Sequence, residues 1–139
     1  MDLDVTSLIR ADFACGAILI TFGALLGKVS PSELLCLALF ECGLFSMNEY
    51  FGALHFGAVD MGGSMFVHTF GAYFGLAVSR MIGVPQKVEH QLENKEEEEE
   101  STKTSDTFAM IGTLFLWVFW SSFNGALASG SQQHRVVIT

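Results

Sequence analysis

Residues 61–84 read MGGSMFVHTFGAYFGLAVSRMIGV, an apolar stretch with one histidine inside it and one arginine near its end. An α-helix rises about 1.5 Å per residue, so this stretch is long enough to cross the roughly 30 Å hydrocarbon core of a bilayer. Gly71 and Gly75 form a GxxxG pair, which is typical of membrane helices that pack closely. The stretch predicts a transmembrane helix pressed against a neighbour.

Three further apolar segments accompany it, at residues 11–26, 31–54 and 107–128, and the first of them is short, at 16 residues. Signals for helix ends lie between them. Ser30, Pro31 and Glu33 predict a capping box with proline at the first helical position. Residues 105–106, Ser-Asp, offer an N-cap for the last segment. The sequence therefore predicts an all-α membrane protein with four transmembrane helices.

The charges of the chain are concentrated in one connection. The chain has 139 residues, 50% of them hydrophobic, with mean hydropathy +0.43 and net charge -8. Residues 85–106 hold 8 of the 15 acidic residues and 3 of the 7 basic ones. We interpret this stretch as a solvated acidic loop without chemistry of its own. A net acidic chain of this kind is not a typical nucleic-acid binder, and its hydropathy excludes an ordinary soluble domain.

Lysine and arginine predict the orientation in the membrane. With four spans, five basic residues fall on the side of the acidic loop and two on the other. The five are Lys28, Arg80, Lys87, Lys95 and Lys103; the two are Arg10 and Arg135. The side with more basic residues is normally cytoplasmic. Both chain ends would then face outward, which we interpret as a sign that flanking helices are missing.

His68 is the first candidate for function because an ionisable side chain at membrane depth is costly. Its imidazole could relay a proton or hydrogen-bond a small polar solute. It could equally be a structural histidine bonded to a neighbouring helix. Asp60, about two turns before it, could cap the helix N-terminus or attract a cation, and the capping role is favoured.

Aromatic and acidic residues supply the remaining candidates. Phe115, Trp117, Phe119, Trp120 and Phe123 crowd the last segment, where an interface belt or core packing is favoured over a cation–π site. Glu41 and Glu49 are expected to face protein or the interface. Three cysteines without CxxC spacing are expected to be small buried side chains. The sequence shows no metal-ligand spacing and no motif of nucleotide binding or hydrolysis, so no metal, cofactor or enzyme activity is predicted.

Four stretches resemble the Amt/Mep/Rh ammonium transporter family, in its animal Rh branch. They are ADF at 11–13 with TFGALLGKVSP at 21–31, NEY at 48–50, DMGGSMFVHTFGAYFGL at 60–76, and FAMIGTLFLWVFWSSFN at 108–124. The resemblance implies a multi-pass plasma-membrane protein of eleven or twelve helices. It also implies assembly as a homotrimer or an Rh-type hetero-oligomer, with one hydrophobic pore per subunit.

The resemblance also implies roles for individual residues. His68 corresponds to the first of two pore histidines, and Asp60 to the aspartate that supports ammonium recruitment at the outer face. Phe13 and Phe123 correspond to the phenylalanines that close the outer end of the pore. Trp120 and Asn124 lie in the same motif and are expected to support the site. The implied activity is recruitment of ammonium, loss of its proton and passage of ammonia.

Two departures from the family pattern bear on these expectations. Ser121 stands where the family usually has proline, so a proline kink beside Phe123 is not predicted. The second pore histidine and the remaining helices are not in these 139 residues, which implies a fragment or a truncated product. The alternative is a non-transporting, structural Rh-type membrane subunit.

Overall fold

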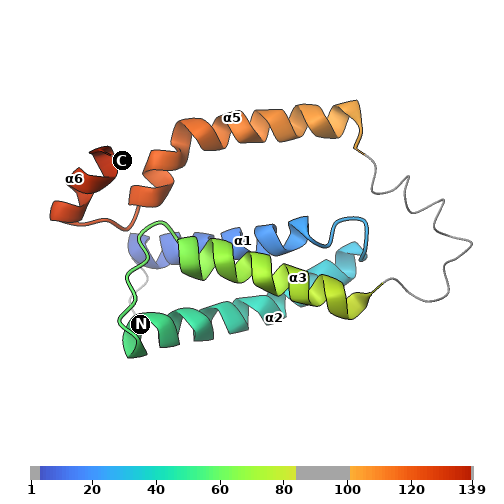
Figure 1. The fold of residues 1–139 in the computed structure, drawn as a ribbon, viewed down its shortest axis with the longest axis horizontal. Helices are drawn as coiled ribbons and strands as arrows, with labels where there is room; N and C mark the ends of the chain where they lie inside the picture. The colour runs from blue at the N-terminus through green and yellow to red at the C-terminus, as the bar shows by residue number, and fades with distance from the viewer. Residues whose placement is uncertain (1–3, 84–100, 139) are drawn as a thin grey trace, which may run out of the picture.

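The computed structural model describes residues 4–83 and 101–138, and within them every regular element is a helix. The elements are α1 (Val5–Gly23), α2 (Pro31–Tyr50), η1 (Phe51–His55), η2 (Ser64–Thr69), α3 (Phe70–Ile82), α5 (Lys103–Gly125) and α6 (Ser131–Ile138), as Figure 1 shows. The two η elements are π-helical turns, which continue α2 and precede α3. The all-α class predicted from the sequence is confirmed.

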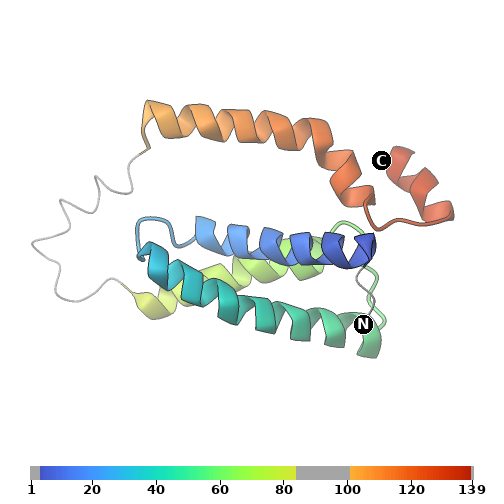
Figure 2. The same cartoon turned by 180° about the vertical axis from the view of Figure 1, so that it is seen from behind.

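Helices α1, α2 and α3 form a bundle, and α5 runs along one side of it (Figures 1 and 2). Successive helices run in alternate directions. The connection between α1 and α2 therefore lies at the same end as the end of α3 and the start of α5. The start of α1, η1, the 57–63 loop and the end of α5 gather at the other end. This arrangement places Asp60 and Phe123 at one end of the molecule.

Two helices begin earlier than the sequence predicted, because capping residues lie further upstream. α1 begins at Val5 instead of residue 11, where Asp4 accepts hydrogen bonds from the Ser7 amide at 2.7 Å and the Ser7 hydroxyl at 2.8 Å. These bonds hold the pKa of the Asp4 carboxyl below its usual value. α5 begins at Lys103, with Thr102 and Ser105 capping each other reciprocally. Ser105 is thus the third helical residue and not the N-cap, and the predicted loop 85–106 ends sooner.

The capping box at α2 is present as predicted. The Ser30 hydroxyl accepts a hydrogen bond from the Glu33 amide, and the Ser30 amide donates to the Glu33 carboxylate at 2.7 Å. Most of the predicted acidic loop, residues 85–100, lies outside the described residues. The cysteine prediction is wrong: Cys15, Cys36 and Cys42 are all exposed, because they lie on helix faces turned away from the three-helix core.

Three helical runs in the described residues are long and apolar enough to cross a membrane: Val5–Gly23, Pro31–His55 and Lys103–Gly125. The predicted third span, 61–84, is divided. Its first residues form a turn after Asp60, η2 then covers Ser64–Thr69, and α3 ends at Ile82. The helical path is therefore shorter than the apolar stretch, because Met61 and Gly62 form a turn and Gly63 is the N-cap of η2.

The core lies where α1, α2 and η2 meet. Its buried side chains are Phe13, Ala14, Ala17, Phe45 and Val67. α1 and α3 approach each other closely at the GxxxG pair. A Cβ at Gly71 would lie 2.6 Å from the Ala17 carbonyl oxygen, and one at Gly75 would lie 3.0 Å from the Thr21 Cα. Only glycine permits this approach of two backbones, so the pair fixes the position of α3 on α1.

Candidate functional site around His68

His68 lies in η2, where the backbone is wound more widely than an α-helix. Its amide donates to the Gly63 carbonyl, five residues earlier, at 2.9 Å, and the Thr69 hydroxyl donates to the Ser64 carbonyl at 2.7 Å. The N-cap of this π-helical turn is Gly63, whose φ of +74° is readily adopted only by glycine. π-helical turns occur frequently at functional sites. The sequence did not reveal this turn.

Two aromatic rings of α5 pack against His68, and an aromatic ring of α1 contacts one of them. The His68 ring centroid lies 5.7 Å from that of Trp120 and 5.9 Å from that of Phe123. Phe123 in turn contacts Phe13 at 4.9 Å and stacks on Trp120 at 5.5 Å. We call His68, Phe13, Phe123 and Trp120 the aromatic cluster. The structure thus brings together four residues that the sequence had singled out, from three separate elements.

The other aromatic residues of α5 do not join this cluster. Trp117 is 78% exposed and Phe115 is 62% exposed, so both face away from the described bundle. This separates two groups that the sequence could not distinguish. Trp120 and Phe123 face His68, while Trp117 and Phe115 have the exposure expected of packing or interface positions.

The Nε2 atom of His68 is buried and has no hydrogen-bond partner among the described residues. Buried polar atoms are nearly always hydrogen-bonded, so such an atom calls for a partner. Among residues 4–83 and 101–138, no neighbouring helix supplies one. Instead the described surroundings of His68 are apolar rings together with one unsatisfied imidazole nitrogen. A small polar solute could use that nitrogen.

Asp60 caps the helical segment that carries His68. Its Oδ2 accepts hydrogen bonds from the amides of Met65 at 2.8 Å and Phe66 at 2.9 Å, and its Oδ1 accepts one from the Ser64 hydroxyl at 3.0 Å. These bonds satisfy amides that a helix start leaves without intrahelical partners. The capping role favoured from the sequence is therefore the one that the structure shows.

Asn124 connects α5 to the turn after Asp60. A Cβ at Gly62 would overlap the Asn124 side-chain oxygen, so the amide packs directly against the Gly62 backbone. The residues between Asp60 and His68 are thus held from two sides, by the Asp60 carboxylate and by α5. Sequence reasoning had not assigned a role to Gly62; its place two residues after Asp60 and directly before Gly63 was the available signal.

α5 bends in its last turns even though Ser121 replaces the usual proline (Figure 1). In this part of the helix the Ser122 hydroxyl donates to the Phe119 carbonyl at 2.8 Å. Serine bonds of this type to the preceding turn commonly bend helices. The last turns of α5 are therefore bent without a proline at position 121.

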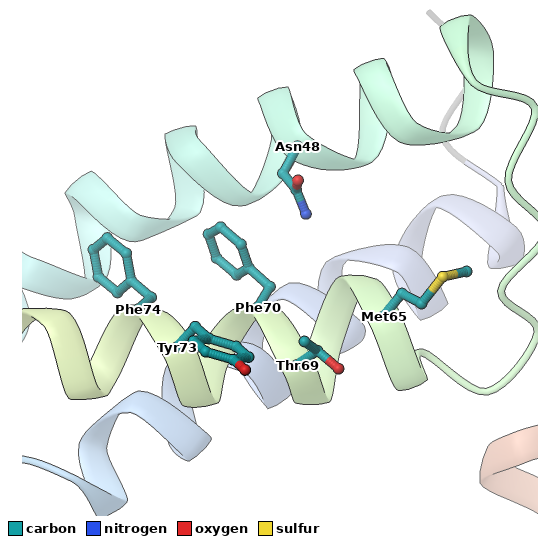
Figure 3. A pocket seen from close by; sticks show the side chains of 6 residues that line it. All are labelled: Asn48, Met65, Thr69, Phe70, Tyr73 and Phe74. Carbon is teal, nitrogen blue, oxygen red and sulfur yellow. The ribbon is translucent and has the colours of Figure 1, made fainter.

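A separate groove of about 420 Å³ lies between α2 and the η2–α3 run (Figure 3). It is lined by Asn48, Met65, Thr69, Phe70, Tyr73 and Phe74. None of the residues predicted for the site lines it. The Asn48 side chain projects from α2 toward the rings of α3, as Figure 3 shows. The candidate site is thus the aromatic cluster and not this groove.

Comparison with known proteins agrees with the motifs. The family model described as Ammonium Transporter Family matches residues 2–139. The chain is 53% identical to "Ammonium transporter Rh type B" of Rattus norvegicus, over 98% of this chain and 29% of that protein. It is also 53% identical to the proteins of the same name in Danio rerio and Homo sapiens, over 94% and 96% of this chain and 28% of each relative.

The chain thus spans less than a third of the length of the relatives it matches. The match nevertheless extends over almost all of its residues, including those of the aromatic cluster and Asp60. Together with the apolar helices, this establishes a multi-pass membrane protein. The chain belongs to the Ammonium Transporter Family, in its Rh branch.

Proposed function

We propose that these helices form part of a hydrophobic path through which the protein moves ammonium nitrogen across the membrane as ammonia. The observation that carries the proposal is the buried, unsatisfied Nε2 of His68 inside the aromatic cluster. An isolated polar atom in apolar surroundings is costly unless a ligand uses it. Ammonia is small enough for such a space and can both donate and accept a hydrogen bond.

The physical argument favours the neutral molecule over the ion. Transferring an unpaired cation into apolar surroundings costs far more than transferring a neutral polar solute. Ammonium would therefore leave its proton on the outer side, and ammonia would pass His68. Aromatic faces at Phe123 and Trp120 could stabilise the cation before it loses that proton. Phe13 and Phe123, in contact at the same end, would close this side of the path.

Asp60 acts in this scheme through the backbone. Its carboxylate already accepts three hydrogen bonds, so its contribution is to hold the start of η2 and with it the His68 ring. The negative charge also favours cations at this end of the molecule. Asn124 and Trp120 fix α5 against the same segment.

The complete path requires more than the described helices. α5 has no buried residue and exposes much apolar surface, as expected of a helix that packs against further helices. We propose that such helices complete the pore, with a second histidine among them, in a homotrimer or Rh-type hetero-oligomer of the plasma membrane.

The proposal is tested by replacing His68 with leucine in the native full-length product of the gene, reconstituted in proteoliposomes. Methylammonium uptake is expected to fall to the level of empty vesicles. His55→Leu is the matched control, because His55 is an exposed histidine at the end of η1 outside the aromatic cluster. Normal uptake by the His68→Leu protein would refute the role of His68.

The alternative role is a structural Rh-type subunit that does not transport. The same experiment distinguishes it, because the unsubstituted protein would then show uptake equal to that of empty vesicles although it is folded and inserted. Uptake that depends on His68 and not on His55 excludes this alternative.

A further inference from the structure

Glu41 is a fully buried carboxyl group that the proposed transport path does not use. It lies in the middle of α2 and has no exposed surface, and neither has Thr21 of α1. The Thr21 Oγ1 atom lies 2.5 Å from Glu41 Oε1 and 3.0 Å from the carbonyl oxygen of Gly71 in α3. One side-chain hydroxyl thus connects three helices at a buried point.

The surroundings of Glu41 contain no compensating charge among the described residues. Within residues 4–83 and 101–138, its buried Oε2 has no hydrogen-bond partner, and Thr21 is the one residue hydrogen-bonded to its side chain. The titratable residues on the elements packed against it point elsewhere: Arg10, Asp12, Cys15, Tyr73 and Arg80 are exposed, and His68 faces the aromatic cluster. On α2 itself, Glu33 and Glu49 lie eight positions away, about 12 Å along the axis.

Counting protons decides how the three groups are connected. A threonine hydroxyl has one proton to donate, and a backbone carbonyl can only accept. If Thr21 donated to an ionised Glu41, the Thr21 and Gly71 oxygens would face each other at 3.0 Å with no proton between them. Glu41 would also be a buried anion with one oxygen unpaired, which costs several kcal/mol.

A proton on Glu41 satisfies both contacts. The carboxylic acid donates to Thr21 Oγ1, and the Thr21 hydroxyl then donates to the Gly71 carbonyl. The short distance of 2.5 Å fits an O–H···O hydrogen bond. No charge is buried, and the unpaired Oε2 becomes the carbonyl oxygen of a neutral acid, which is less costly to leave unbonded than a carboxylate oxygen.

We propose that Glu41 is a proton-holding site that stays a neutral carboxylic acid in the folded membrane protein. The hydrogen-bond chain runs in one direction, from Glu41 through Thr21 to Gly71, and it fixes the crossing of α2, α1 and α3. Glu41 keeps its proton and is a positioning residue, separate from any proton released by a transported ion.

The position of Gly71 gives the Glu41–Thr21–Gly71 hydrogen-bond chain its structural effect. Gly71 follows His68 by three residues, and its backbone contacts α1 at Ala17. The hydrogen bond from Thr21 therefore holds α3 against α1 within one turn of the aromatic cluster. Loss of these hydrogen bonds is expected to loosen the contact between α1 and α3. It would remove no side chain of the aromatic cluster.

Infrared spectroscopy of the native full-length protein in lipid at neutral pH tests the protonation state directly. We expect an absorption band in the C=O stretching region of protonated carboxylic acids. This band should be absent from Glu41→Gln, an uncharged replacement of nearly equal shape, and unchanged in Glu49→Gln. A spectrum without such a band, or a band that survives Glu41→Gln, would overturn the proposal.

A second set of variants tests the direction of hydrogen-bond donation from Glu41 through Thr21 to Gly71. Thr21→Val leaves the Glu41 proton without an acceptor, so we expect a lower melting temperature in detergent and a shift of the Glu41 band. Thr21→Ser keeps the hydroxyl, so its melting temperature and its Glu41 band should match those of the unsubstituted protein. Thr113→Val is the matched control, because the Thr113 hydroxyl donates only to Ala109 of its own helix. Equal stability of the Thr21→Val and Thr21→Ser proteins, with an unshifted band in both, would contradict the proposed chain.

Discussion

The rings of Phe13 and Phe123 lie 4.9 Å apart and are tilted by 39°, although the two residues stand near opposite ends of the chain. Their contact joins α1 to α5 beside His68. Phe13 is only 8% exposed, so the pair is part of the core as well as part of the proposed outer closure.

This contact predicts energetic coupling between the two residues. A double-mutant cycle of Phe13→Leu and Phe123→Leu should give a coupling free energy of about 0.5–1.5 kcal/mol, the usual value for an aromatic pair. The measurement is the free energy of unfolding in detergent for the two single variants and the double variant. Phe108→Leu, at a 70% exposed position on α5, is the control and should be additive with Phe13→Leu. Additivity of Phe13 and Phe123 would show that the rings do not interact.

Asp60 should contribute to stability through its hydrogen bonds to the start of η2. Asp60→Ala removes the acceptors for the Met65 and Phe66 amides, and the loss of an N-cap side chain costs about 1–2 kcal/mol. Hydrogen exchange at those two amides should accelerate in parallel. Asp60→Asn keeps one acceptor oxygen, so its stability should lie between those of the unsubstituted protein and Asp60→Ala. The exposed Asp12→Ala serves as control. Unchanged exchange at Met65 and Phe66 would argue against the cap.

The close approach of α1 and α3 predicts that alanine is not tolerated at Gly71. The added Cβ would meet the Ala17 carbonyl oxygen at 2.6 Å, so the helices must separate. Overpacking of this kind costs about 1–3 kcal/mol. Gly23→Ala is the matched control, since a Cβ there meets nothing within 4 Å. Thermal denaturation in detergent compares the two variants, and equal melting temperatures would contradict the packing described.

Gly62 and Asn124 should behave as a coupled pair. Gly62→Ala places a methyl group on the Asn124 amide and is expected to push α5 away from η2, which lowers both stability and methylammonium uptake. Asn124→Ala removes the obstructing atoms, so the double variant should be more stable than Gly62→Ala alone. Gly112→Ala, in open space on α5, provides the control. A double variant less stable than either single one would exclude this explanation.

The sequence by itself determined the helices and their order. The Ser30 capping box, the GxxxG pair at Gly71 and three of the four apolar runs are local patterns that appear in the described helices. The fourth run, at 61–84, is divided by the turn before η2. Helix starts were less predictable, because several polar residues near each end could serve as the cap. Asp4 and Thr102 were the ones whose side chains reached the free amides.

Only the tertiary structure decided which candidates act together. The motifs named His68, Phe13, Phe123, Trp120, Asn124 and Asp60, but a motif carries no distances. The contacts between Phe13, Phe123 and His68 depend on how α1, η2 and α5 pack. The packing of Asn124 on Gly62 and the burial of Glu41 against Thr21 likewise involve residues on different helices or loops. Periodicity within one helix cannot encode them, because they arise where the faces of different helices meet.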